Sequence, residues 1–186
     1  MADIGQVLLQ AAEVIESEVD KRLEELNEVD DFEALRAQRL AQLKKKQENR
    51  MKWLHEGHGK INEVVEEKDF FNETRGVERC IVHFHRPQSK YSDLLGQHLQ
   101  KLAELHIETK FVRINAEKSP FLCTRLGVTI IPTLSLIEKG KVAGKIEGLE
   151  AFGGEKLTTH SVEKVFATFK MVDDIQTEGP GEDELD

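Results

Sequence analysis

Apolar residues in the first part of the chain recur at steps of three and four, which is typical of one face of a helix. The repeat passes through Ile4, Leu8, Ala11, Ile15, Val19, Leu23 and Leu26. A polar stretch at residues 27–31 interrupts it, and Asp30 with Glu33 resembles a capping box that would start a second helix. Neither half contains a proline, so a nearly continuous helix is the alternative. We expect a helical arm over residues 1–57, which ends in the glycine loop at Gly57 and Gly59.

From about residue 60, short apolar runs alternate with helical segments. We predict strands over residues 61–65, 79–85, 110–114, 133–137 and 142–148. We predict helices over residues 66–74 (with Phe70 and Phe71 facing the core), 92–105, 120–126 and 161–171. The last two strands form a hairpin around Gly140. This order predicts an α/β fold over residues 58–171, in which a central mixed sheet carries helices on both faces.

The net charge of −9 is spread unevenly along the chain. Residues 1–35 hold eleven acidic and two basic residues, and residues 36–54 hold seven basic and one acidic residue. Residues 171–186 hold seven acidic residues and no basic one. This pattern indicates partner contacts guided by charge, or simply a well-solvated surface. We expect residues 172–186 to form an acidic disordered tail.

The cellular environment can be inferred from cysteine use and from the lack of targeting patterns. Two cysteines in 186 residues are no disulfide framework and fit a reducing compartment. The first twenty residues are acidic and lack the basic region of a secretory signal. No run approaches the roughly 20 apolar residues that a membrane span needs. We expect a cytoplasmic protein without a membrane partner or cofactor, and leave access to the nucleus open.

A long helix with an apolar stripe is unstable in water unless something covers the stripe. The cover would be the rest of the chain, a second copy in a coiled coil, or a different partner. The run Lys44, Lys45 and Lys46 would suit nucleic acid phosphates. However, Trp53 is the one aromatic residue close to it and the whole chain is acidic, so we expect no nucleic acid partner.

The order of elements, with Ile131-Pro132-Thr133 before the hairpin, resembles the thioredoxin fold over about residues 60–171. The resemblance implies a cis peptide bond before Pro132, which would face the redox motif. Thioredoxins carry Cys-x-x-Cys where this chain has Ser89-Lys90-Tyr91-Ser92, and they bury an aspartate where this chain has His83. A serine hydroxyl cannot form the mixed disulfide of thiol exchange. We therefore expect a degenerate redox site and no catalytic residue.

Further motifs narrow the resemblance. They are the charged helix at residues 31–40, the stretch at 52–59, Glu67-Lys68-Asp69-Phe70-Phe71, Pro120-Phe121-Leu122-Cys123 and residues 148–153. Together they resemble the phosducin-like family, and within it the branch called thioredoxin domain-containing protein 9. This resemblance implies binding to the cytosolic chaperonin TRiC and an effect on the folding of actin and tubulin. Phosducin itself binds G-protein βγ dimers through an N-terminal helix, but its binding motif is not evident here, which makes a βγ regulator the weaker alternative.

Several residues remain as candidates for contacts or chemistry. We expect partners to bind Lys44, Lys45, Lys46 and Trp53 in the arm, and Lys90 and Tyr91 beside the Pro132 loop. A residual thiol oxidoreductase is the other alternative and would need Cys123 as a reactive thiol at a helix N-terminus. The more ordinary interpretation of Cys123 is a small core residue. His83 and His85 share a strand face but lack a third ligand, so we expect no metal site.

Overall fold

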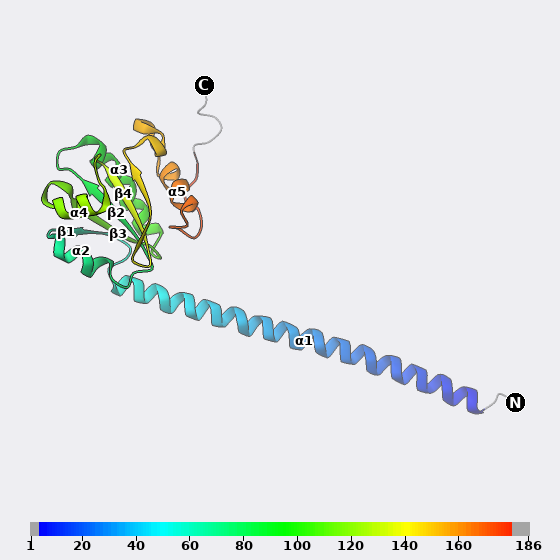
Figure 1. Ribbon diagram of the computed structural model, residues 1–186. Helices are drawn as coiled ribbons and strands as arrows, with labels where there is room; N and C mark the ends of the chain where they lie inside the picture. Colours follow the sequence, from blue (N-terminus) through cyan, green and yellow to red (C-terminus); the bar gives the residue numbers. More distant parts are fainter. Residues whose placement is uncertain (1–3, 180–186) are drawn as a thin grey trace, which may run out of the picture. The chain divides into compact units, whose positions relative to one another are not determined.

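The computed structural model describes residues 4–179, with side chains described for residues 15–22 and 32–179. The chain divides into two compact units, Met1–Asn49 and Arg50–Asp186. Helix α1 (Ile4–His55) is continuous over 52 residues (Figure 1). The polar stretch at residues 27–31 does not end the helix. It contains neither proline nor glycine, and its weaker helix formers alone are not enough to break the backbone hydrogen bonds.

The end of α1 is anchored in the second unit. The ring of Trp53 is half-buried and stacks on that of His58, with a centroid separation of 6.2 Å. The imidazole of His58 lies 2.7 Å from the carbonyl oxygen of Ile107 through Nδ1. These contacts explain why the second unit begins at Arg50, several residues before the boundary after residue 57 that the sequence suggested.

The central sheet has five strands in the order β1-β3-β2-β4-β5 (Figure 1). β1 and β2 both pair parallel with β3, while β4 pairs antiparallel with β2 and with β5. The strands are β1 (Ile61–Val64), β2 (Arg79–His85), β3 (Lys110–Asn115), β4 (Thr133–Glu138) and β5 (Lys141–Glu147). The expected mixed sheet with a terminal hairpin is confirmed.

Two helices cover each face of the sheet. α3 and α5 share one apolar cluster, which contains Leu95, Leu99, Phe111 and Phe166. α2 and α4 contribute to the opposite cluster through Phe70 and Leu122. The helices are α2 (Glu67–Thr74), α3 (Lys90–Leu105), α4 (Pro120–Leu126) and α5 (Thr159–Thr168), with short 3-10 turns at Ala116–Lys118, Glu150–Phe152 and Gly154–Lys156. Because side chains alternate along a strand, β2 sends its odd-numbered residues toward α3.

One core expectation is wrong. Phe70 is buried, but Phe71 is 53% exposed. Consecutive helical residues point about 100° apart. A helix of only eight residues lying on a sheet therefore buries one of the two rings and leaves the other in solvent.

A buried histidine lies between two carboxylates beside α5. His106 is fully buried, with Nε2 2.6 Å from Oε1 of Glu163 and Nδ1 3.1 Å from Oε1 of Glu108. Burial opposes a charge on His106, but the hydrogen bonds to the two carboxylates outweigh it and raise its pKa. Each ring nitrogen faces a carboxylate oxygen, which can only accept, so both nitrogens carry a proton and the ring is an imidazolium that bridges two carboxylates.

The same carboxylates hold the segment that follows α5. Glu163 accepts hydrogen bonds from the backbone amides of Gln176 (2.7 Å) and Thr177 (3.0 Å), and Glu108 accepts one from Asp173 (3.3 Å). The described part of the expected tail, residues 172–179, is thus bound to the domain rather than disordered. The acidic side chains of this segment gave no sign of this attachment, because the groups that bind the domain are backbone N–H groups, which every residue except proline has. Residues 180–186 lie outside the described residues.

Candidate functional site

The motif Ser89-Lys90-Tyr91-Ser92 lies where β2 leads into α3. Ser89 caps the helix, and its hydroxyl oxygen accepts a hydrogen bond from the backbone N–H of Ser92 at 3.4 Å. The hydroxyl of Ser92 is buried and accepts from the backbone N–H of Arg86 at 3.4 Å. Both serines therefore serve as local acceptors that stabilise the turn and the first turn of α3.

A groove of about 320 Å³ runs beside this motif. It is lined by Tyr91, Ile131, Pro132, Gly148, Leu149, Glu150, Gly154 and Glu155. The peptide bond between Ile131 and Pro132 is cis, as the resemblance implied. The phenol of Tyr91 is 49% exposed and donates to Oε1 of Glu155 at 2.8 Å. The structure thus brings the degenerate motif and the Pro132 loop to the same groove, with a rim of mixed apolar and acidic character.

Two features of this groove were not expected from the sequence. Glu155 lies 64 residues from Tyr91 in the chain, in a short 3-10 turn that has no sequence motif of its own. Ile130 directly precedes the groove-lining Ile131 and is 51% exposed. No local pattern marks it as an exposed residue, because its neighbour Ile131 is also apolar.

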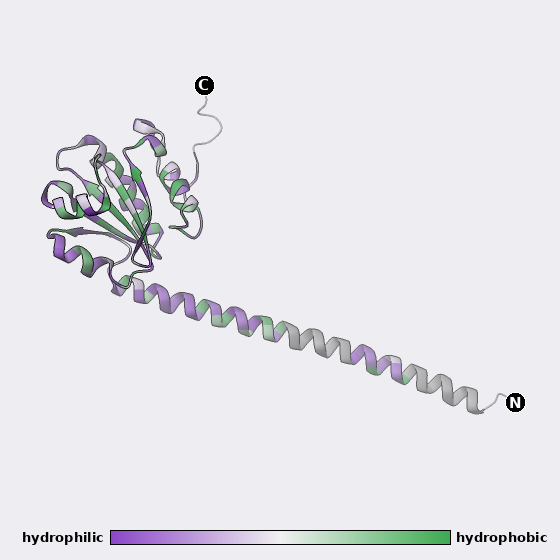
Figure 2. Cartoon of the chain, in the orientation of Figure 1, coloured by the Kyte–Doolittle hydropathy of each residue, from purple (hydrophilic) through white to green (hydrophobic). Residues whose placement is uncertain are grey.

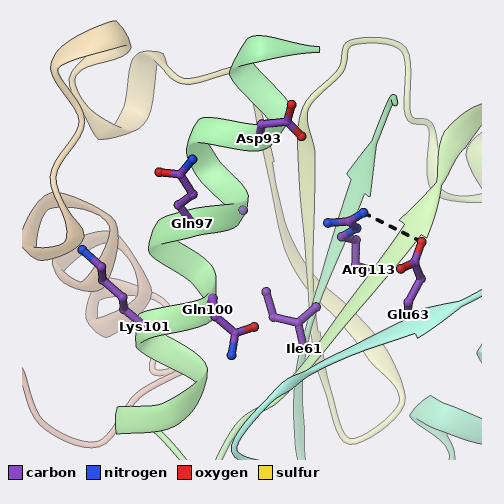
Figure 3. Close-up of a pocket in the computed structure, with 8 residues that line it drawn as sticks. Ile61, Glu63, Asp93, Gln97, Gln100, Lys101 and Arg113 are labelled. Carbon is purple, nitrogen blue, oxygen red and sulfur yellow. Dashed lines mark ion pairs between the residues drawn. The ribbon is translucent and has the colours of Figure 1, made fainter. Parts of the chain in front are cut away.

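A second, polar pocket of about 780 Å³ lies between α3 and the β1–β3 edge of the sheet (Figure 3). The side chains of Asp93, Gln97, Gln100 and Lys101 on α3 line it, and in this view Asp93 extends toward the side of Arg113 and Gln100 toward Ile61. Arg113 on β3 faces the gap, with Nη2 3.8 Å from Oε1 of Glu63.

Unpaired polar groups lie behind this pocket. His83 neighbours Arg113 across β2 and β3 and lies next to Gly96, where an added Cβ would be 3.9 Å from its Cε1. Both ring nitrogens of His83, Nε2 of His85 and Nε of Arg113 are buried without a hydrogen-bond partner among the described residues. Burial, then the nearby His85 and Arg113, lower the pKa of His83 to about 3. His83 is therefore neutral near pH 7 and cannot provide the carboxylate that a thioredoxin has at this position.

Comparison with known proteins agrees with this geometry. The thioredoxin family model matches residues 62–158. Thioredoxin domain-containing protein 9 of mouse is 39% identical over 158 residues, which cover 83% of this chain and 70% of that protein. The Caenorhabditis elegans protein of the same name is 37% identical, with 90% and 82% covered. This chain belongs to the thioredoxin domain-containing protein 9 family. Phosducin-like protein 3 of Drosophila melanogaster is also similar, at 36% identity over 78% of this chain and 68% of that protein.

Solved structures support the fold. A thioredoxin from Halobacterium salinarum superposes with a TM-score of 0.53 at 16% identity, covering 62% of this chain and 96% of that chain. The short form of spinach chloroplast thioredoxin F gives a TM-score of 0.51 at 16% identity, with 61% and 96% covered. The expected thioredoxin fold is thus confirmed.

The cysteines of this family member lie away from the groove. Cys80 is on β2 and Cys123 on α4, and the described residues contain no Cys-x-x-Cys pair. Burial raises the pKa of Cys80 to about 12. Burial and the carboxylate of Glu67 raise the pKa of Cys123, whose thiol lies 3.5 Å from the carbonyl oxygen of Ala116. These surroundings disfavour a thiolate, so the geometry fits the core interpretation of Cys123 better than the reactive one.

The remaining expected contact residues differ in accessibility. Lys44, Lys45, Lys46 and Lys90 are exposed. Trp53 is half-buried against His58, which gives it a structural role at the end of α1. Among the described side chains, no group of three or more histidine, cysteine or acidic residues is placed to hold a metal ion. Within residues 4–179, none of the helices is both long and apolar enough to cross a membrane.

Proposed function

We propose that this protein is a phosducin-like co-chaperone without thiol chemistry, which binds the cytosolic chaperonin TRiC and modulates the folding of actin- or tubulin-type clients. One observation carries the proposal. Both thiol positions of the redox motif are serines engaged in backbone hydrogen bonds, while the groove beside them is retained. A retained groove without attacking groups supports binding rather than electron transfer.

The groove offers specific contacts to a protein partner. Tyr91 lines it, and Ile130 directly precedes Ile131, which also lines it. Both Tyr91 and Ile130 expose about half of their surface, and exposed aromatic and aliphatic side chains of this kind supply most of the affinity at protein interfaces. Glu150 and Glu155 line the same groove, so a partner segment with an apolar residue next to a basic one fits it best.

The arm offers a different kind of contact. Lys44, Lys45 and Lys46 are exposed on α1 within a segment of strongly positive charge. Such a cluster attracts an acidic surface and mainly accelerates association, with an effect that salt screens. We assign these lysines to the encounter with the chaperonin and the groove to the short-range contact.

Binding to purified TRiC at low salt tests the proposal. Tyr91→Ala combined with Ile130→Ser should raise Kd about tenfold or more, because it removes two interface anchors. Val142→Ser is the matched control, since Val142 is also 51% exposed but lies on β5.

The triple change of Lys44, Lys45 and Lys46 to Glu should slow association and flatten its salt dependence. The same change at the exposed Lys118, Lys139 and Lys141 is its control. Wild-type protein that fails to bind at low salt would overturn the proposal.

Two activity measurements complete the test. Refolding of actin by TRiC, with and without the protein, shows whether binding changes client folding. Insulin reduction with a Cys123→Ser control tests the oxidoreductase alternative, and cysteine-dependent turnover there would contradict a function without thiol chemistry. A parallel pull-down with G-protein βγ dimers tests the remaining alternative, a βγ regulator, which none of the described contacts supports.

A further inference from the structure

Helix α1 carries apolar side chains that repeat every seven residues. Among the described residues of its unit, no other side chain covers them. Val19 and Leu40 occupy one position of the repeat, which we call a, and Ile15 and Leu43 occupy the other, which we call d. These four side chains are 51% to 64% exposed. Figure 2 shows apolar patches in the described parts of α1, which are otherwise largely polar. In the sequence the repeat continues with Leu8, Ala12, Leu26 and Val29. A continuous helix with this repeat is the pattern of a coiled coil.

The same positions also hold charges, and these charges decide the orientation of a pair. Arg22, Arg36 and Arg50 occupy position d, and Glu33 occupies position a. In a parallel pair in register, every core residue faces its own copy. Three layers would then hold two arginines each and one layer two glutamates, with like charges in direct contact. Such layers are unfavourable, so a parallel pair is a poor solution for this sequence.

An antiparallel pair removes the conflict. In that arrangement each a position of one helix faces a d position of the other. The two helices run in opposite directions, so the three-residue step from a to d in one helix lies beside the three-residue step from d back to a in the other. The register that places Ile15 opposite Leu40 of the partner subunit also places Arg22 opposite Glu33 of the partner subunit. By symmetry this gives two such ion pairs in the seam. A shift by one repeat in either direction sets Arg22 opposite a leucine instead, so the sequence selects one register.

The charge of the whole arm agrees with this register. Residues 36–51, with six basic and one acidic residue, then lie opposite residues 4–19 of the second copy, which hold three acidic and no basic residues. Arg36 faces Val19 of the partner subunit, where a long arginine can lay its methylene groups on the valine and keep its charge in water. Each basic segment thus meets an acidic one along about 25 Å of helix, at 1.5 Å per residue.

We propose that the arm forms an antiparallel two-stranded coiled coil with a second copy of this chain, in the register that pairs Arg22 with Glu33 of the partner subunit. This inference goes beyond the proposed function and does not depend on it. It also has a consequence for that function. Pairing covers Leu40 and Leu43, next to the lysines assigned to the chaperonin, so the dimer should compete with chaperonin binding.

Sedimentation equilibrium of the full chain tests the pairing. The wild type should reach twice the mass of one chain. Arg22→Glu and Glu33→Arg should each raise the dimer Kd about tenfold or more, because each places like charges in two layers. The double variant, in which the pair is exchanged, should return to within about threefold of the wild type. Lys21→Glu and Glu48→Arg are controls, since they make the same charge changes on the outer side of the seam.

Disulfide crosslinking tests the orientation. In a Cys123→Ser background, protein with Ile15→Cys is mixed with protein carrying Leu40→Cys and then oxidised; Cys80 is buried and does not interfere. The antiparallel register predicts a mixed disulfide between the two proteins, whereas a parallel pair would link each protein to itself. A purely monomeric wild type, self-linked products, or a double variant that stays as weak as the single ones would each overturn the inference. Circular dichroism confirms that every variant remains helical. A monomer that still binds TRiC would refute only the pairing and leave the proposed function standing.

Discussion

Nε2 of His106 lies 2.6 Å from Oε1 of Glu163, and both side chains are fully buried. His106 follows α3, whereas Glu163 lies on α5, so the pair joins two helices that are far apart in the sequence. The carboxylate of Glu163 also holds the backbone of Gln176 and Thr177. One ion pair thus connects the sheet-covering helices to the C-terminal segment.

Replacement of Glu163 by glutamine should lower the free energy of unfolding by about 3 kcal/mol, because it leaves a buried imidazolium without its closest counter-charge. The amide NH₂ group would also meet backbone donors that the carboxylate now accepts. Urea denaturation followed by circular dichroism measures the change. Glu138→Gln is the control, since Glu138 is exposed at the end of β4, and it should change stability by less than about 0.5 kcal/mol. A loss below about 1 kcal/mol for Glu163→Gln would contradict a charged bridge.

The contribution of this cluster should depend on pH in both directions. The pKa of His106 is raised above its ordinary 6.5, so its share is complete below pH 6.5 and is lost as the pH rises through the higher folded value. Burial opposes the carboxylate of Glu163, but hydrogen bonds from Gln176, Thr177 and His106 lower its pKa below 4.5. Its share is therefore complete above pH 4.5 and is lost as the pH falls. The stability difference between wild type and Glu163→Gln should peak between these values, and a difference that does not vary with pH would argue against the assignment.

His83 should make the protein sensitive to acid. Its folded pKa of about 3 lies below that of the unfolded chain, so the unfolded state takes up a proton below pH 6.5 that the folded state refuses. His83→Leu removes this difference in proton uptake. At pH 7 the variant should have nearly the same free energy of unfolding as the wild type, because the ring nitrogens have no hydrogen-bond partners to lose among the described residues. The variant should gain roughly 2 kcal/mol relative to wild type between about pH 7 and pH 5. His55→Leu, at an exposed position, serves as the control and should show no such gain. Parallel pH curves for wild type and His83→Leu would refute the prediction.

Two substitutions should restore a disulfide but little catalysis. Ser89→Cys with Ser92→Cys places thiols at the first turn of α3 in a frame that the fold already provides. Under mild oxidation the number of titratable thiols in denatured protein should fall from four to two, since the chain has two cysteines of its own. Insulin reduction should stay slow, because the neutral His83 stands where thioredoxins have a carboxylate. The Ser89→Cys variant alone should keep all its thiols, and a double variant that does the same would show that the motif is misaligned.

The local pattern of apolar and polar residues was sufficient to predict most helices and strands, but not which of their residues are buried. The helix predicted over residues 120–126 has these bounds in the structure, and Gly127 ends it with a φ of 64°, in the left-handed region that favours glycine. The start of α3 was placed two residues late, because Ser89 rather than a later residue caps it. Phe71 was expected to face the core and is instead exposed. This error concerns which side of α2 the sheet covers, and the local sequence does not encode that.

The sequence alone determined the absence of a Cys-x-x-Cys pair, the order of strands and helices, and the charge polarity of the arm, because these follow from residue identity and short-range periodicity. Only the tertiary structure decided that Tyr91 meets Glu155, that His83 lies unpaired beside Arg113, and that His106 bridges Glu108 and Glu163. Such pairs join positions distant in the chain. The packing of helices on the sheet brings the two residues of each pair together, and the spacing of residues along the chain does not encode this packing.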